Sequence, residues 1–267
     1  MATPNAIQIT DRGDSRIAPF VGIRERDLTG GTDGRFIVEG KVPLSILLTK
    51  SRFELDSLFL CESRLQPLAE ILTMVPEEIP VYTATQELMD SIAGFPIHRG
   101  VLACARKGDP TDLSVLLEAQ RVLILNQLSN HDNVGAAFRN AAAFGVDGIL
   151  LDERSCDPLY RKAIRVSSGA SLWMPFHHGG TGDDQLEALK AAGFEIWAMT
   201  PHPGAAPIHD LKPPAKLAIV LGAEGPGLPA ALIEAAQAVR IPMQKGFDSI
   251  NVATAGAIAL SHVFSAQ

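Results

Sequence analysis

Apolar runs in the second half of the chain constrain its fold more than any other feature. They occupy residues 122–125, 146–151, 194–199 and 217–221, with a shorter run at 239–243. Strands that are apolar at almost every position suit a parallel sheet that helices cover on both faces. Helix-forming stretches separate or follow the runs, at 133–144, 158–168, 184–192, 229–237 and 251–264. The second half therefore reads as a parallel-sheet α/β domain, which we place at residues 119–267.

The ends of three of these helices carry local signals. Gly145 is expected to close the first helix in a left-handed conformation. Asp183 or Asp184 is expected to open the third helix, and Ser249 or Asn251 to cap the last one.

The first half alternates shorter strands and helices. An ordered unit begins at 36–40, strands are expected at 55–60, 79–82 and 100–105, and helices at 43–48, 64–73 and 85–92. This alternation predicts a small α/β sandwich over residues 35–106. Residues 1–34 lack periodicity and end in a glycine-rich stretch, so they are predicted to form an irregular arm. Residues 107–118 contain Gly108-Asp109-Pro110 and are predicted to be a linker, because a residue before proline disfavours helix.

Composition excludes several classes of protein. The net charge of −7 argues against a protein that coats nucleic acid non-specifically, although a local basic patch remains compatible with it. The three cysteines show no spacing typical of a zinc site or a disulfide framework. No run of about 18 apolar residues and no export signal occurs. We expect a cytoplasmic protein without a membrane segment or a metal.

Polar residues and glycines gather where the apolar strands end, which is where open α/β sheets bind ligands. In the first such segment, 130–140, Asn133 lies in the first turn of a predicted helix, and Gly135 and Arg139 share one face. An arginine on a helix otherwise rich in alanine is unusual. A solvent-facing Arg139 explains the pattern equally well.

Two further segments have the same character. Residues 221–229 place three glycines between a strand and a helix, so that the backbone can approach a ligand closely, and Glu224 lies among them. Residues 241–257 combine polar residues with small ones that allow close helix packing. A tight turn and a capped helix account for these two segments individually, but they do not explain why all three occur together.

The three segments resemble the ordered motifs of one known family. NVGAAFRNAAAFG, LGAEGPGL and IPMQKGFDSINVATAGAIAL look like the three motifs of the SpoU/TrmH RNA 2′-O-ribose methyltransferases, within the SPOUT superfamily, in the same order. Residues 36–101 are similar to the substrate-binding domain that often precedes this catalytic domain. Two positions differ from the usual motif, with Ile250 in place of leucine and Ala253 in place of serine.

The resemblance implies a fold and a cofactor. The C-terminal domain would contain a deep trefoil knot, an exception to the rule that chains are unknotted. The segments 222–227 and 241–253 would form the knot and hold S-adenosyl-L-methionine. The cofactor-binding residues it implies are Leu221, Gly222, Ala223, Gly225, Ile241, Met243, Ile250 and Ala253. Such sites usually lie at a homodimer interface, so a homodimer is expected.

The resemblance also implies a reaction, methyl transfer to a ribose 2′-hydroxyl of a structured RNA. The appended N-terminal domain favours rRNA over tRNA. Arg139 matches the arginine often given the role of proton acceptor; it can equally bind a phosphate and stabilise the developing alkoxide, because guanidinium stays protonated. The remaining catalytic positions are Asn133, Glu224, Ser249 and Asn251.

Alternatives remain open at this point. The chain can be a base methyltransferase of the same superfamily, or a non-catalytic RNA-binding or assembly factor that keeps the fold. A further basic cluster near Ser167 has two interpretations, a phosphate-binding site or a solvated helix face; its members are Arg154, Arg161, Lys162 and Arg165. No metal-ligand spacing surrounds His177, His178 or His202, which are expected to be loop histidines.

Overall fold

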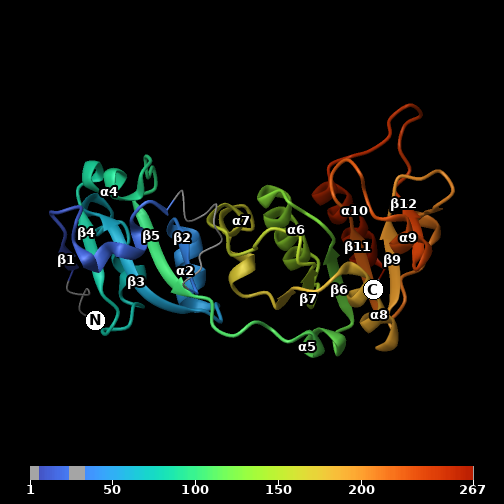
Figure 1. Ribbon diagram of the computed structural model, residues 1–267, viewed down its shortest axis with the longest axis horizontal. Helices are drawn as coiled ribbons and strands as arrows, with labels where there is room; N and C mark the ends of the chain where they lie inside the picture. Colours follow the sequence, from blue (N-terminus) through green and yellow to red (C-terminus); the bar gives the residue numbers. More distant parts are fainter. Residues whose placement is uncertain (1–5, 24–33, 267) are drawn as a thin grey trace. The chain divides into compact units, whose positions relative to one another are not determined.

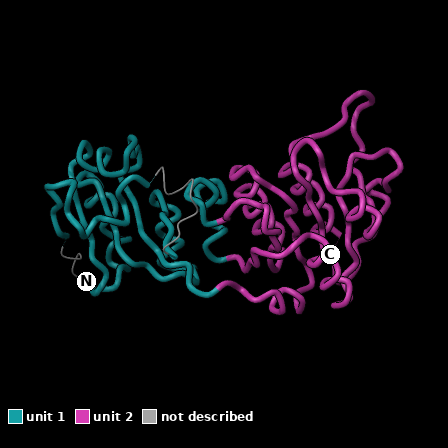
Figure 2. The backbone as a smooth tube through the Cα atoms, in the orientation of Figure 1, with its two compact units in different colours: residues 1–109, 159–173 teal, residues 110–158, 174–267 magenta. Residues whose placement is uncertain are grey.

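The computed structural model describes residues 6–23 and 34–266, and they form two compact units (Figure 2). Unit 1 comprises residues up to 109 together with 159–173, and unit 2 comprises 110–158 and 174 onward. The segment 159–173 therefore packs with unit 1, although it lies between two strands of unit 2 along the chain. In the described ranges, no helix is long and apolar enough to cross a membrane.

Unit 2 is built on a parallel sheet of seven strands, as the apolar runs predict. The order across the sheet is β10-β12-β9-β11-β6-β7-β8. The strands are β6 (Arg121–Leu125), β7 (Gly148–Leu151), β8 (Phe176–His178), β9 (Glu195–Met199), β10 (Ala206–Pro207), β11 (Leu217–Leu221) and β12 (Gln237–Arg240). Two of them, β8 and β10, were not predicted, and β12 begins earlier than the run 239–243 indicated.

Helices cover both faces of this sheet (Figure 1). On one face, α6 (His131–Ala143) packs against α10 (Val252–Ser265). The opposite face packs into an apolar core with α5 (Leu113–Leu117), α8 (Gly182–Ala191) and α9 (Ala230–Glu234).

The helix ends in unit 2 follow the predicted signals with one exception. Gly145 is left-handed after α6, with φ +64°, and Asn251 caps α10, so both predictions are confirmed. The exception is α8, which is capped by Thr181, whose hydroxyl accepts the N–H of Asp184. The predicted caps Asp183 and Asp184 lie inside the first turn, because the hydroxyl of Thr181 already accepts the free N–H of Asp184.

Unit 1 contains a mixed sheet of five strands in the order β1-β4-β3-β5-β2. The strands are β1 (Ala6–Gln8), β2 (Arg35–Glu39), β3 (Glu54–Cys61), β4 (Val81–Ala84) and β5 (Val101–Arg106). The helices are α2 (Lys41–Thr49), α3 (Ala69–Leu72), α4 (Gln86–Ala93) and α7 (Arg161–Val166). Alternate strand residues such as Ile37, Phe59 and Leu102 face a core shared with α4.

Two predictions for unit 1 are corrected by the structure. Residues 6–23 are not irregular throughout, since β1 pairs with β4 and a 3₁₀ helix at Ser15–Phe20 buries Ile17 and Phe20. The glycine-rich stretch at the end of the predicted arm falls mostly on residues 24–33, which lie outside the described residues. The predicted helix 64–73 is reduced to α3, and a 3₁₀ turn at Glu62–Arg64 precedes it.

Candidate functional site

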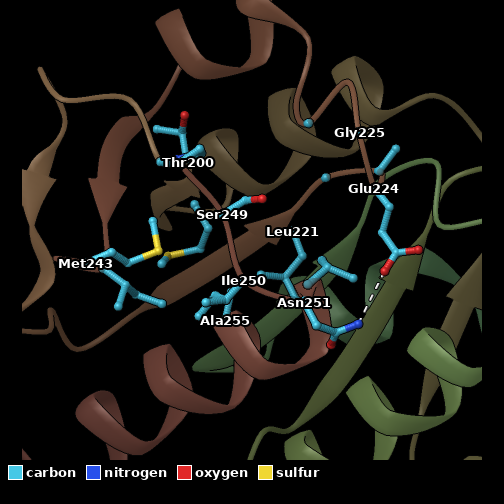
Figure 3. A pocket seen from close by; sticks show the side chains of 16 residues that line it. Thr200, Leu221, Glu224, Gly225, Met243, Ser249, Ile250, Asn251 and Ala255 are labelled. Atoms are coloured by element: carbon cyan, nitrogen blue, oxygen red, sulfur yellow. Dashed lines mark hydrogen bonds between the residues drawn. The ribbon is translucent and has the colours of Figure 1, made fainter. Parts of the chain in front are cut away.

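A cavity of about 410 Å³ lies at the carboxyl edge of the unit 2 sheet (Figure 3). Its walls follow the ends of β9, β11 and β12, which point to the same edge because the strands are parallel. The lining residues are Met199, Thr200, Pro201, Leu221, Gly222, Ala223, Glu224, Gly225, Gly227, Ile241, Met243, Ser249, Ile250, Asn251, Val252 and Ala255. Most of them are small or apolar, so backbone groups and hydrocarbon form most of the surface.

The glycine loop after β11 forms one wall through its backbone. A Cβ on Gly222 would lie 2.6 Å from the carbonyl carbon of Gly227 and from the nitrogen of Leu228, so only glycine fits there without a shift of the chain. Ala223 accepts the N–H of Gly227 at 3.1 Å, which closes the loop on itself. Gly225 has a left-handed φ of +89°. The loop therefore has little room to rearrange without losing these contacts.

Three of the predicted catalytic residues form one hydrogen-bond network. Asn251 Nδ2 donates to Oδ1 of Asn133 at 2.9 Å and to Oε1 of Glu224 at 3.3 Å. Oδ1 of Asn251 accepts the backbone N–H groups of Ala253 and Thr254, which orients the amide. One side chain thus joins the starts of α6 and α10 to the glycine loop.

A second contact fixes α10 against α6. Nδ2 of Asn140 donates to the carbonyl oxygen of Ala253 at 2.9 Å. On α10, Gly256 allows the helix to approach β11, since a Cβ at this position would lie 2.7 Å from Cδ1 of Leu221. These contacts set the position of Asn251 relative to the cavity.

Asn133 and Arg139 occupy different environments on α6. Asn133 is buried, and its Nδ2 has no hydrogen-bond partner among the described residues. Arg139 is exposed and makes no hydrogen bond or ion pair within the described part of the chain. It is not among the residues that line the cavity.

The structure brings most of the predicted cofactor residues together. Seven of them line the cavity, namely Leu221, Gly222, Ala223, Gly225, Ile241, Met243 and Ile250. Ala253 is buried beside the cavity rather than in its wall, and Ala255 lines the wall instead. Glu224, Ser249 and Asn251 also line it. The sequence reasoning overlooked Thr200 and Pro201, although they directly follow β9 at the same edge.

The remaining titratable candidates have structural roles. His177 and His178 lie in β8 rather than in a loop, and their rings contact the carbonyl oxygens of Thr111 and Ser155. His202 lies in a loop, as expected, and its Nδ1 accepts the N–H of Gly204.

Burial raises the pKa of the Cys156 thiol to about 12, which removes it as a nucleophile at neutral pH. Across the described ranges, no three His, Cys, Asp or Glu side chains are grouped to hold a metal.

The basic cluster near Ser167 is divided by the fold. Arg161 forms an ion pair with the buried Glu39 in unit 1, and Nη1 of Arg165 lies 3.7 Å from the same carboxylate. A solvated helix face is therefore the wrong interpretation for Arg161. Arg154 instead lines a separate cavity of about 230 Å³ in unit 2.

Comparison with known proteins places this site in a family. Residues 120–261, more than half of the chain, match the model of the SpoU rRNA methylase family. An "uncharacterized tRNA/rRNA methyltransferase" of Mycobacterium bovis is 38% identical over 94% of this chain and 89% of its own length. A 23S rRNA (guanosine-2′-O-)-methyltransferase of Acinetobacter baylyi is 30% identical over 74% of this chain and 83% of its own.

The fold is also shared with a solved structure. An AdoMet-bound rRNA methyltransferase from Sinorhizobium meliloti superposes with a TM-score of 0.80 at 20% identity, over 97% of both chains. This likeness confirms the predicted α/β fold, and the bound group is the cofactor that the sequence motifs indicated. The chain belongs to the SpoU rRNA methylase family, a family of RNA methyltransferases that use S-adenosylmethionine.

Proposed function

We propose that this chain transfers the methyl group of S-adenosylmethionine to a ribose 2′-hydroxyl of a structured RNA, with rRNA favoured over tRNA. The observation that carries the proposal is the network of Asn133, Glu224 and Asn251 beside a backbone-lined cavity. The 23S rRNA (guanosine-2′-O-)-methyltransferase among the relatives supports both the ribose target and the rRNA class.

The cavity fits the cofactor in size and in lining. Apolar side chains such as Leu221 and Ile250 offer a surface for an adenine ring, and the loop backbone supplies hydrogen-bonding groups that need no side chain. Glu224 adds a carboxylate at the same wall, where it favours a positively charged ligand. When bound, the cofactor supplies an activated methyl group. The chain itself must hold the target hydroxyl in place, let its proton leave to water, and stabilise the charge that develops on its oxygen.

Positioning is the role we assign to the asparagine network. Methyl transfer needs a hydroxyl held in line with the methyl group, and a small misplacement is costly in rate. Asn251 connects Asn133 and Glu224, so the starts of α6 and α10 keep a fixed position relative to the glycine loop, beside which the target hydroxyl would lie. Ser249 lies two residues before Asn251 and also lines the cavity, where it would orient the ribose.

Arg139 is assigned to charge stabilisation. Its guanidinium stays protonated at all accessible pH values, so it is a poor proton acceptor but a strong partner for a phosphate or a developing alkoxide. It is exposed, and no described side chain competes for it. The group is therefore available to a nucleotide that approaches the cavity.

Three structural statements belong to the same proposal. The chain would act as a homodimer, residues 222–227 and 241–253 would form a trefoil knot, and residues 35–106 would bind the RNA substrate. With the limits of the two compact units, the RNA-binding domain would also include residues 159–173, and the methyltransferase domain would comprise 110–158 and 174 onward.

Mapping 2′-O-methyl groups in total RNA from cells with and without the gene tests the proposal. We expect one ribose methyl, in rRNA, to disappear with the gene. Loss of a base methyl instead would identify a base methyltransferase. An unchanged set of methyl groups, with RNA binding retained, would identify a non-catalytic RNA-binding factor.

A further inference from the structure

A chain with a net charge of −7 needs a local surface to hold a polyanion. We propose that one edge of the unit 1 sheet binds the phosphodiester backbone of the substrate RNA, an inference that rests on the proposed function. We call it the arginine edge and define it as Arg64, Arg99, Arg161 and Arg165. No single stretch of the sequence is strongly basic here, because these residues come from three separate segments of an acidic chain.

Backbone pairing brings the segments together. The N–H of Gly40 donates to the carbonyl oxygen of Val101 at 3.0 Å, and that of Cys61 donates to Gly100 at 2.9 Å. The carboxyl ends of β2 and β3 therefore meet the amino end of β5. Any side chain attached near these three ends shares one edge of the sheet.

Two arginines lie directly on this junction. Nη1 of Arg99 lies 3.1 Å from where a Cβ on Gly40 would be, and Nε of Arg64 lies 3.2 Å from the equivalent position on Gly100. Both glycines have left-handed φ angles, of +101° and +61°. The absence of side chains at Gly40 and Gly100 therefore makes room for two guanidinium groups.

The other two arginines approach the same junction from α7. Arg161 pairs with Glu39, the residue before Gly40, and its guanidinium lies 4.6 Å from the ring centre of Phe95. Only 13% of the Arg161 side chain and 6% of the Glu39 side chain are exposed. Arg165 is more open at 37% and lies 3.7 Å from Glu39. The buried carboxylate thus holds Arg161 in place and leaves Arg165 facing outward.

The charge balance at this edge is positive. Two of the four guanidinium groups, those of Arg161 and Arg165, pair with the buried carboxylate of Glu39, and Lys41 adds a further cation at the start of α2. The nearby Glu62 opposes them, and its Oε1 accepts a hydrogen bond from Gln8. Arg99 makes no hydrogen bond or ion pair among the described residues. Nη2 of Arg64 donates to the carbonyl oxygen of His98 at 3.4 Å, whereas its Nε is buried without a partner there.

The chemistry of this set favours phosphate. Guanidinium offers paired N–H groups that match two oxygens of a phosphate, and several arginines in a row fit successive phosphates of a backbone. An apolar ligand would leave these donors without partners, and a single carboxylate could pair with only one of the guanidinium groups at a time. The 2.9–3.0 Å backbone pairing holds the edge rigid before RNA arrives.

Fluorescence anisotropy of the full-length chain with a labelled RNA stem-loop, measured over a salt series, tests the inference. The variants are Arg64→Gln, Arg99→Gln and the double variant. The matched control is Arg106→Gln, which removes the same charge at the other end of β5, about 20 Å away. Arg99 is exposed, so its variant should fold even if Arg64→Gln does not.

We expect weaker RNA binding for each variant and a salt slope lower by about 1 for each lost phosphate contact, with Arg106→Gln unchanged. Wild-type affinity and slope in the double variant, or an equal loss in Arg106→Gln, would overturn the inference. Equal binding of inorganic phosphate and the stem-loop would also overturn it, since the site would then serve a free anion. Cofactor affinity, measured in parallel, reports on the proposed function separately because unit 2 is unaltered.

Discussion

The carboxyl edge of the unit 2 sheet and the arginine edge of unit 1 differ in the charged side chains that they present. At the carboxyl edge of unit 2, a cavity is lined mostly by backbone and by small or apolar residues, and Asn251 in its wall bonds to Glu224 and Asn133. At the arginine edge of unit 1, guanidinium groups outnumber the carboxylates that face them. The difference supports our two proposals, that the first edge binds the cofactor by shape and that the second binds the RNA backbone by charge.

The largest effect that this comparison predicts concerns the buried carboxylate of unit 1. Glu39→Gln leaves Arg161 without its charged partner, and breaking a buried pair in this way costs about 3 kcal/mol in the free energy of unfolding. Urea denaturation followed by tryptophan fluorescence measures the loss, since one of the two tryptophans, Trp173, lies in unit 1 and the other, Trp197, in unit 2.

An exposed pair in the same unit provides the control. Arg106 pairs with Asp56 at 2.6 Å, but 58% of its side chain is exposed. Asp56→Asn should therefore cost about 1 kcal/mol or less. If the free energy of unfolding falls by the same amount in both variants, burial does not distinguish the two ion pairs, and Glu39 has no greater structural role than Asp56.

A second prediction tests the exposed Arg139 of unit 2. Arg139→Ala should lower the rate of methyl transfer about 100-fold, which is typical for removal of one group that stabilises developing charge. The thermal unfolding midpoint should stay unchanged, because Arg139 is exposed and makes no hydrogen bond or ion pair in the described chain. Full activity of the variant would remove Arg139 from the reaction.

The architecture of unit 2 was readable from the sequence because its signals are local. The runs that became β6, β9 and β11 are apolar at nearly every position, and the loops that follow them indicate the ligand edge. In contrast, β1 has only three residues and is defined by its pairing with β4. Two of the three residues of β8 are histidines, so the segment lacks the apolar run that predicts a buried strand. Neither has a pattern of its own.

Long-range contacts explain what the sequence left open. Asn251 and Asn133 are 118 residues apart, and Arg161 and Glu39 are 122 residues apart. Nothing in the local pattern near Arg161 distinguishes an ion pair from a solvated side chain. The family motifs named the residues of the network, but its hydrogen bonds required the fold.

A third prediction separates two glycines in the cavity wall. Gly222→Ala places a methyl group 2.6 Å from backbone atoms, so the loop must shift, at a cost of about 1–3 kcal/mol. Cofactor affinity should fall with it. Gly225→Ala meets no atom within 4 Å and bears only the strain of its left-handed φ. A cofactor affinity that falls more for Gly225→Ala would show that loop conformation, and not close packing at Gly222, shapes the cavity.

The smallest predicted effect concerns Asn251. Asn251→Ser keeps an oxygen that caps α10 but loses the N–H groups that reach Asn133 and Glu224, at a cost of about 1 kcal/mol. Asn251→Asp also keeps the cap, but it places a second carboxylate beside Glu224. Methyl-transfer rates should therefore fall further in the aspartate variant than in the serine variant. Equal rates in both variants and the parent chain would show that the network has no part in positioning.

Isothermal titration calorimetry of the full chain with S-adenosylmethionine and its demethylated product tests the central claim most directly. The claim is that the cavity at the carboxyl edge of unit 2 is a cofactor site built mainly from backbone. It predicts binding of both compounds at micromolar concentration, weakened by Gly222→Ala and unaffected by Arg99→Gln in unit 1. Absence of micromolar binding, or binding that Gly222→Ala leaves unchanged, would contradict it.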